Sequence, residues 1–192
     1  MLNVAKKNIH IYLESNPNPN SLKFVVNEVL IPEGLSFDFP DKKSAATAPL
    51  ALELFDYPFI DRVFYMNNFV TVTKKADSEW AEVQNTIKQH IKAFLESGKL
   101  ILDQKAPPLT DAGDETETVK KIKTILDEYI RPAVEQDGGA ITFHSFKDKK
   151  VTVTLQGSCS GCPSSTITLK SGIENLFKKM MPEEVEEVEA LG

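Results

Sequence analysis

Residues 141–177 are ITFHSFKDKKVTVTLQGSCSGCPSSTITLKSGIENLF, and the succession of patterns in this stretch decides how the second half of the chain folds. Apolar and polar residues alternate in ITFHSF and in VTVTLQ, which is typical of strands, and the charged KDKK between them predicts a hairpin turn. After the cysteines, apolar residues recur at helical spacing at Leu169, Ile173, Leu176, Phe177 and Met180. The stretch therefore predicts a hairpin, a loop that carries both cysteines, and a helix.

Elements on either side complete this domain. Before the hairpin we expect a helix capped by Asp114, with Glu117 three residues on and an apolar side of Val119, Ile122, Leu126, Tyr129 and Ile130. Pro132 is expected to end that helix nearby, and QDGG at 136–139 is typical of a turn. The tail EEVEEVEAL allows a short final strand with Val185 and Val188 buried or half-buried. The C-terminal domain is therefore predicted to be α-β-β-α-β.

The first 102 residues predict a second small domain of strands and helices. Period-two alternation predicts strands at 9–13 and 22–26, on either side of the turn-rich SNPNPNS. RVFYMNNFVTVT predicts a hairpin that turns at Asn67-Asn68, because Asn tolerates positive φ. Prolines and small residues predict only loops between Ile31 and Pro49.

Two helices are expected in the same part of the chain. ALELFDYPFID predicts a short helix that cannot continue past Pro58. A longer helix, capped by Asp77 and ended by Gly98, would carry an apolar face of Trp80, Val83, Ile87, Ile91, Phe94 and Leu95. Strands followed by a packed helix make an α+β domain.

The stretch from Asp103 to Glu117, DQKAPPLTDAGDETE, has too little apolar area to fold alone. We therefore predict an α+β protein of two small domains, 1–102 and 116–192, joined by a flexible linker at 103–115.

Composition limits the partners and the compartment. Lys plus Arg is 22 against 28 for Asp plus Glu, so the net charge of -6 argues against nucleic acid as a partner. No apolar run approaches the roughly 20 residues that span a bilayer, so no membrane is expected. The opening MLNVAKKNIHIYLES has neither a signal-peptide core nor an Arg-rich transit pattern, which predicts a cytosolic protein unless a targeting segment has been removed.

The two cysteines, Cys159 and Cys162, are the candidate site. With only 2 cysteines in the chain, a disulfide framework is not credible, and a close pair in a reducing compartment more often serves metal or redox chemistry. Small neighbours let the loop curl so that both sulfurs face one point, namely Gly157, Ser158, Ser160, Gly161 and Ser164. N-H groups at the start of the following helix, where Pro163 is tolerated, favour the negative charge of thiolates. Iron prefers such soft ligands.

The number of cysteines indicates how such a site is completed. An iron-sulfur cluster usually takes four cysteines and this chain has 2, so a second copy is the simplest source of the others. Two copies on a twofold axis would hold one solvent-accessible cluster between them, which suits transfer to another protein. We therefore expect a homodimeric carrier and not an enzyme.

Other interpretations remain open at this point. A thiol-disulfide oxidoreductase also uses Cys-x-x-Cys at a helix start, although no aromatic residue precedes Cys159 and the loop follows an antiparallel hairpin instead of opening a βαβ unit. Zinc would need two further ligands, and His144 is the only histidine nearby in sequence. His10 and His90 are interpreted as structural. A plain interaction module with incidental cysteines is the third possibility.

A family resemblance adds to these patterns. Arg131-Pro132, Asp137-Gly138-Gly139 and the loop from Gly157 to Pro163 together resemble the NifU C-terminal domain, also called the Nfu domain, over nearly all of 116–190. Asn16 to Pro19, followed by Leu22 to Phe24, is similar to the Asn-Pro-Asn-Pro turn and Leu-Lys-Phe strand of the Nfu N-terminal domain.

This resemblance implies the cargo and the partners. Cys159 and Cys162 would be ligands of a 4Fe-4S cluster, with 2Fe-2S as the alternative, that bridges two subunits and is delivered to apo-proteins. Because the chain has no other cysteines, it would be a late carrier that receives its cluster from an upstream scaffold. The N-terminal domain would recognise client proteins or position the cysteine loop.

Overall fold

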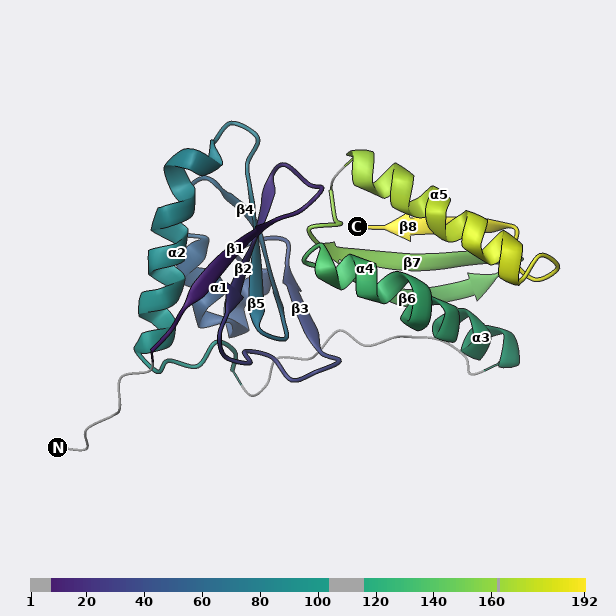
Figure 1. Cartoon of the computed structure of the whole chain (residues 1–192), viewed down its shortest axis with the longest axis horizontal. Helices are drawn as coiled ribbons and strands as arrows, with labels where there is room; N and C mark the ends of the chain where they lie inside the picture. The colour runs from purple at the N-terminus through teal and green to yellow at the C-terminus, as the bar shows by residue number, and fades with distance from the viewer. Residues whose placement is uncertain (1–7, 104–115, 162) are drawn as a thin grey trace. The chain divides into compact units, whose positions relative to one another are not determined.

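The computed structural model describes residues 8–103, 116–161 and 163–192, with the side chains of 163–166 left out of the description. These residues form two compact units of helices and strands, which confirms the predicted α+β class (Figure 1). Apart from Asp103, the predicted linker at 103–115 lies outside the described residues, as does the expected helix cap Asp114.

The N-terminal unit is built on an antiparallel sheet with strand order β1-β2-β5-β4-β3. Its strands are β1 (Ile11–Ser15), β2 (Ser21–Val26), β3 (Ser36–Phe39), β4 (Ile60–Met66) and β5 (Phe69–Lys74). The hairpin of β4 and β5 turns at Asn67, whose φ of 44° confirms the turn expected there. The prediction that 31–49 holds only loops is wrong, because β3 pairs along β4 and four residues are too few to show alternation.

Two helices cover one face of this sheet (Figure 1), α1 (Pro49–Leu54) and α2 (Trp80–Glu96), and a 3-10 turn, η1 (Ser44–Thr47), precedes α1. Their apolar sides meet Phe24, Val63 and Val70 of the sheet in one buried core. The predicted cap Asp77 is wrong, because α2 starts after Glu79 and has no side-chain cap. Gly98 ends the helix as expected, with a φ of 72°.

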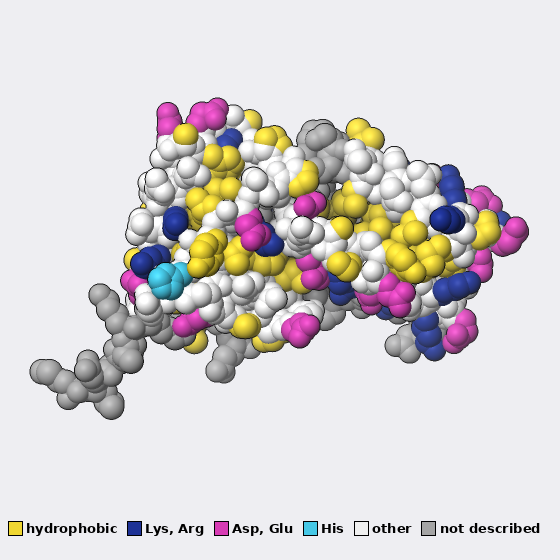
Figure 2. All heavy atoms as spheres, viewed as in Figure 1, with side chains coloured by type: hydrophobic (Ala, Val, Ile, Leu, Met, Phe, Trp, Pro, Cys, Tyr) yellow, Lys and Arg dark blue, Asp and Glu magenta, His cyan; other side chains and the backbone are white. Residues whose placement is uncertain are grey.

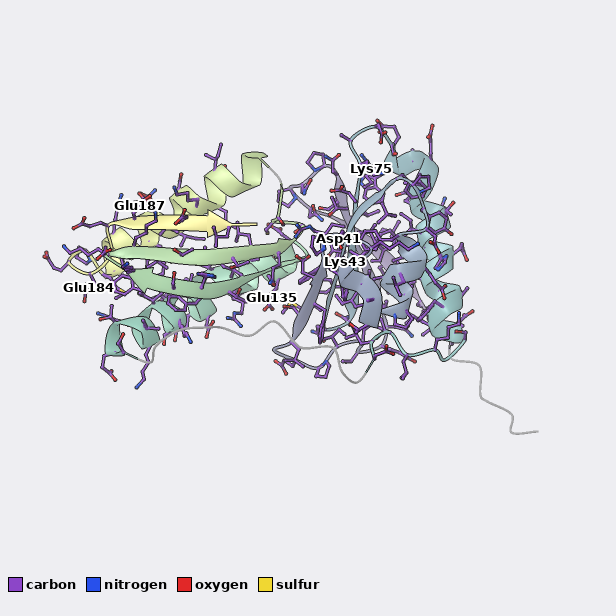
Figure 3. The ribbon with its side chains drawn as sticks, turned by 180° about the vertical axis from the view of Figure 1, so that it is seen from behind. Asp41, Lys43, Lys75, Glu135, Glu184 and Glu187 are labelled. Carbon is purple, nitrogen blue, oxygen red and sulfur yellow. The ribbon has the colours of Figure 1, made fainter. Side chains whose placement is uncertain are left out.

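The C-terminal unit is built on a three-stranded sheet with order β6-β7-β8. β6 (Gly139–Lys147) and β7 (Lys150–Gly157) are an antiparallel hairpin that turns at Asp148 and Lys149, both with positive φ, as expected from KDKK. β8 (Glu187–Leu191) pairs with β7 in parallel. Figure 3 shows this sheet in front of its helices, with Glu187 and Glu184 at one end, where they pair with Lys150 and Lys121.

Helices cover one face of the C-terminal sheet, the face turned away from the viewer in Figure 3. They are α3 (Glu117–Ile125), the π-helical turn η2 (Leu126–Ile130), α4 (Arg131–Gln136) and α5 (Pro163–Met180). The element order confirms α-β-β-α-β, and α5 connects two parallel strands, β7 and β8. The expectation that the cysteine loop does not open a βαβ unit is therefore wrong. The tail EEVEEVEAL alone could not show which side of β7 the last strand would join.

The first helix differs from expectation at both of its ends. Thr116 is its cap, where its Oγ1 accepts a hydrogen bond from Val119 N at 3.3 Å. Pro132 does not end the helix, because Arg131 N bonds the Leu126 carbonyl five residues back and the chain then restarts as α4. Pro132 has no N-H to donate, and at the start of α4 none is needed. This π turn accommodates the proline within a nearly continuous helix.

Two residues expected on apolar helix faces point to solvent. Tyr129 is 54% exposed and Met180 is 38% exposed, whereas Ile125 and Met181 are buried. The π turn holds an extra residue and so shifts the phase of the side chains after it, and Met181 lies just past the end of α5. Apolar side chains reach the surface of the C-terminal unit (Figure 2). Ile130, Leu169 and Leu176 pack against its core and are only partly buried. Among the described residues, no helix combines the length and apolarity needed to cross a membrane.

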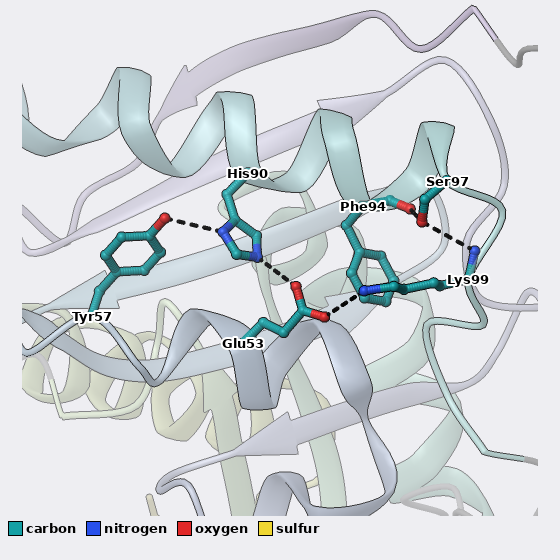
Figure 4. A network of polar contacts seen from close by, with 6 residues as sticks. All are labelled: Glu53, Tyr57, His90, Phe94, Ser97 and Lys99. Atoms are coloured by element: carbon teal, nitrogen blue, oxygen red, sulfur yellow. Dashed lines mark hydrogen bonds and ion pairs between the residues drawn. The ribbon is translucent and has the colours of Figure 1, made fainter.

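A polar network joins α1 to α2 in the N-terminal unit (Figure 4). The Tyr57 hydroxyl lies 3.0 Å from His90 Nδ1, and His90 Nε2 lies 3.0 Å from Glu53 Oε2. Lys99 Nζ donates a hydrogen bond of 2.9 Å to the other oxygen of Glu53. The Lys99 hydrogen bond lowers the pKa of Glu53 below its ordinary value, against partial desolvation and with help from His90. His90 is thus part of the structure, as interpreted from the sequence.

The lowered pKa of Glu53 predicts how the stability of the N-terminal unit depends on pH. Glu53→Gln should reduce the free energy of unfolding at neutral pH by about 1 kcal/mol or less, because the carboxylate is partly exposed. The difference from wild type should persist above the ordinary pKa of 4.5 and vanish as the pH falls through the lower folded value. Urea unfolding followed by Trp80 fluorescence at several pH values measures this.

The exposed Glu33 supplies the matched control, since no ion pair involves it among the described residues. Glu33→Gln should leave the stability and its pH dependence unchanged. If the loss in free energy of unfolding caused by Glu53→Gln stayed the same as the pH fell well below the ordinary pKa of Glu, the role given to the ionised carboxylate would be contradicted.

Candidate functional site

Cys159 lies in the turn that leaves β7 and leads into α5. The residue is 6% exposed, and it packs within the apolar core of the C-terminal unit. Cys162 lies outside the described residues, so the placement of its sulfur relative to that of Cys159 stays a prediction. α5 begins at Pro163, directly after Cys162, as expected from the sequence.

Two glycines allow the cysteine loop to curl. Gly157 and Gly161 have φ values of 62° and 72°, a conformation that residues with a Cβ rarely adopt. Ser160 N bonds the Gly157 carbonyl at 3.2 Å and closes the turn around Cys159. These φ values confirm the expected curl at the two glycines, whereas the expectation that both sulfurs face one point stays a prediction.

The loop is held against the turn between α4 and β6. Ser158 Oγ donates to the Asp137 carbonyl at 2.6 Å, and Ser158 N donates to the Gly138 carbonyl at 3.3 Å. Gly138 has a φ of 80°, which lets the chain reverse after α4. Ser158 Oγ also lies 3.8 Å from Cys159 Sγ. Through these hydrogen bonds Ser158 holds the neighbouring Cys159 next to the Asp-Gly-Gly turn.

Sequence analysis missed this attachment and the closeness of Gly139 to the Cys159 sulfur. It identified Asp137-Gly138-Gly139 only as a turn and Ser158 only as a small neighbour. The sequence did hold a hint of this contact. The three turn residues stand at the start of a strand that pairs with the strand before the cysteines, so the two turns had to lie near each other. The pairing of Gly139 with Gly157 is what brings the two turns together.

The histidines do not complete a metal site in the described residues. His144 is exposed and lies five residues along β6 from Gly139, which at roughly 3.3 Å per residue places it about 16 Å from that end of the strand. It contacts Ser145 Oγ at 3.2 Å. His10 is exposed beside β1, and His90 belongs to the network of Glu53. No group of three His, Cys, Asp or Glu side chains within 8–103, 116–161 or 163–192 could hold a metal ion.

Comparison with known proteins assigns the family. Residues 11–98 match the family described as "Scaffold protein Nfu/NifU N terminal", and residues 122–189 match the "NifU-like domain". The chain belongs to the NifU-like (Nfu) family. The two Nfu matches cover most of both structural units, and the second includes Cys159 and Cys162.

Curated relatives of this Nfu chain align over most of its length. It is 39% identical over 189 residues, 97% of this chain and 66% of the relative, to "NFU1 iron-sulfur cluster scaffold homolog, mitochondrial" of Drosophila persimilis. The protein of the same name in Drosophila grimshawi is 40% identical over 182 residues, 93% of this chain and 60% of the relative. The chain therefore spans slightly less than two thirds of these relatives.

Among solved structures, a NifU-like protein from Saccharomyces cerevisiae is similar with a TM-score of 0.48 and 22% identity. The match covers 55% of this chain and 92% of that one.

The comparisons correct the predicted compartment. The relatives are named as mitochondrial, which points to mitochondria, so the expectation of a cytosolic Nfu protein is wrong. The folded domains carry no mark of the compartment, because targeting is determined by segments separate from the fold.

The attachment of the cysteine loop predicts unequal effects of two serine substitutions. Ser158→Ala should lower the stability of the C-terminal unit by about 1 kcal/mol, because the part-buried hydrogen bond to the Asp137 carbonyl is lost. It should also speed amide exchange in the loop from Gly157 to Gly161. Urea unfolding by circular dichroism and hydrogen exchange by mass spectrometry measure both.

Ser160→Ala is the matched control in the same turn. Ser160 is 4% exposed and its Oγ has no hydrogen-bond partner among the described residues, so its removal should cost little or slightly stabilise. Equal losses from both substitutions would contradict the special role of Ser158.

Proposed function

We propose that this Nfu chain is an iron-sulfur cluster carrier that binds its cargo through Cys159 and Cys162 and passes it to apo-proteins. The observation that carries the proposal is the placement of the Cys159 thiol. Cys159 lies in a glycine-shaped turn, held by the hydrogen bond of Ser158 to Asp137, near the start of an 18-residue helix. Soft thiolate ligands beside a helix N-terminus suit the binding of iron and sulfide.

The number of donors supports a shared site. A cluster takes four thiolates as a rule, and this chain has 2 cysteines. No further set of metal-binding side chains occurs in the described part of the chain. Two copies would supply Cys159 and Cys162 twice, so the proposed cargo is a 4Fe-4S cluster in a homodimer, with 2Fe-2S as the alternative.

The proposed role is transfer and not catalysis. An upstream scaffold would donate the cluster, and apo-proteins that need it would accept it. A site made by two short loops can release its cargo when the two copies separate or when acceptor thiolates replace the ligands one by one. The N-terminal unit would recognise clients or position the cysteine loop.

One observation favours a second candidate function. The cysteine loop connects β7 to α5, and α5 leads to the parallel strand β8, so Cys159 and Cys162 do open a βαβ unit. This is the setting in which a Cys-x-x-Cys sequence serves disulfide exchange. A thiol-disulfide oxidoreductase is therefore the alternative that an experiment must separate from the carrier.

Anaerobic reconstitution with iron and sulfide tests the proposal. We expect about two irons and two sulfides per chain, a 4Fe-4S Mössbauer signature and a dimeric mass in solution, because two chains supply the usual four ligands. The loaded protein should then transfer the cluster to an apo-ferredoxin. Two sulfides and two irons per dimer would instead identify the 2Fe-2S form.

Serine substitutions supply the controls. Cys159→Ser/Cys162→Ser should bind no cluster yet keep the circular dichroism of wild type, since both units have apolar cores without metal. A double variant with an unchanged cluster would refute the ligand assignment. Catalytic disulfide reduction by wild type, with mixed disulfides trapped by Cys162→Ser and no cluster, would establish the oxidoreductase instead.

A further inference from the structure

Gly139, the first residue of β6, lies against the sulfur of Cys159. A Cβ added at Gly139 would stand 2.9 Å from Cys159 Sγ, 3.3 Å from Cys159 N and 2.6 Å from the Gln156 carbonyl oxygen. Carbon atoms do not approach sulfur or carbonyl oxygen that closely without displacing them. The space that holds the Cys159 sulfur is therefore the space that a side chain at residue 139 would fill.

Space, and not backbone conformation, is what requires glycine here. The glycines of the described residues with positive φ include Gly138 and Gly157, but Gly139 is not among them. Its backbone is that of an ordinary strand residue, paired with Gly157. An alanine would thus suit the backbone of residue 139 and would conflict only with its neighbours.

The two neighbours would respond differently to a Cβ. The Gln156 carbonyl belongs to β7, where Gln156 is paired with Ala140 and is 4% exposed, so it resists movement. Cys159 Sγ is the last atom of a side chain that can rotate about one bond, so an overlap with it can be relieved by rotation. The overlap with the Gln156 carbonyl therefore strains the hairpin whether or not the sulfur is present, and the overlap with the sulfur adds a displacement of the Cys159 side chain.

We propose that Gly139 is a positioning residue for Cys159: the absence of a side chain at residue 139 fixes where the candidate ligand's sulfur lies and keeps it covered. This inference deepens the proposed function and rests on it for its effect on the cluster. Its structural half, the contact between residue 139 and the sulfur, can be tested without any metal.

A double-mutant cycle in the metal-free chain tests the contact. Gly139→Ala should destabilise the C-terminal unit, and the loss should be clearly smaller in a Cys159→Ala background, where the sulfur is absent. Urea unfolding by circular dichroism measures all four variants. Should Gly139→Ala alone fail to fold, recovery of folding in Gly139→Ala/Cys159→Ala supports the proposal. Equal losses in both backgrounds, or no recovery, would overturn it, because the conflict would then lie with Gln156.

Thiol reactivity reports where the sulfur lies. In a Cys162→Ser background only Cys159 can react, and Gly139→Ala should raise its rate of alkylation by iodoacetamide by on the order of tenfold, as the sulfur loses its cover. Gly172→Ala is the matched control, because a Cβ at Gly172 on α5 would meet no atom within 4 Å beyond its chain neighbours and the adjoining backbone of its own helix. It should leave the rate unchanged. An equal rate in wild type and Gly139→Ala would contradict the proposal.

The cluster separates this inference from the proposed function. After reconstitution, Gly139→Ala with both cysteines present should lose its cluster several times faster than wild type and Gly172→Ala. If the stability cycle and alkylation behave as expected while wild type binds no cluster, Gly139 positions the thiol and the carrier function fails. If wild type binds a cluster that Gly139→Ala retains unchanged, the positioning role fails and the carrier function stands.

Discussion

The hydrogen bond from Ser158 to the Asp137 carbonyl is the contact on which the candidate site depends. It ties the turn after β7 to the turn before β6, two segments about twenty residues apart in sequence that meet because β6 and β7 are a hairpin. Ser158 N bonds the neighbouring Gly138 carbonyl, and Gly139 leaves room for the sulfur beside it. Cys159 therefore has a defined place before any metal arrives.

The rest of the C-terminal unit supports this arrangement. The π turn lets the helix pass Pro132 and continue as α4, which delivers Asp137 to the start of β6. On the other side, α5 leaves the cysteine loop and returns the chain to β8 alongside β7. The apolar core of these elements is built from side chains alone, so under the proposed function a cluster could be gained and lost while the fold persists. That separation of folding from loading is what a carrier needs.

Patterns in the sequence predicted most of the elements, and the errors have particular causes. Tyr129 was placed on an apolar face because a 3.6-residue period was continued through a π turn. β3 was missed because it has only four residues and is held by its partner β4. Cytosolic location was inferred from residues that do not encode it. In each case the deciding information lay outside the local stretch.

The sequence by itself determined the α+β class, both hairpins, the number of cysteines and their position between a strand and a helix, because periodicity and turn residues act locally. Only the tertiary structure decided that β8 joins β7 in parallel, that Cys159 is buried, that Gly139 lies beside its sulfur and that Ser158 bonds the Asp137 carbonyl. Those facts depend on which distant segments pack together. Such packing depends on how many side chains from different elements fit together, and a pattern within one stretch of sequence cannot show this.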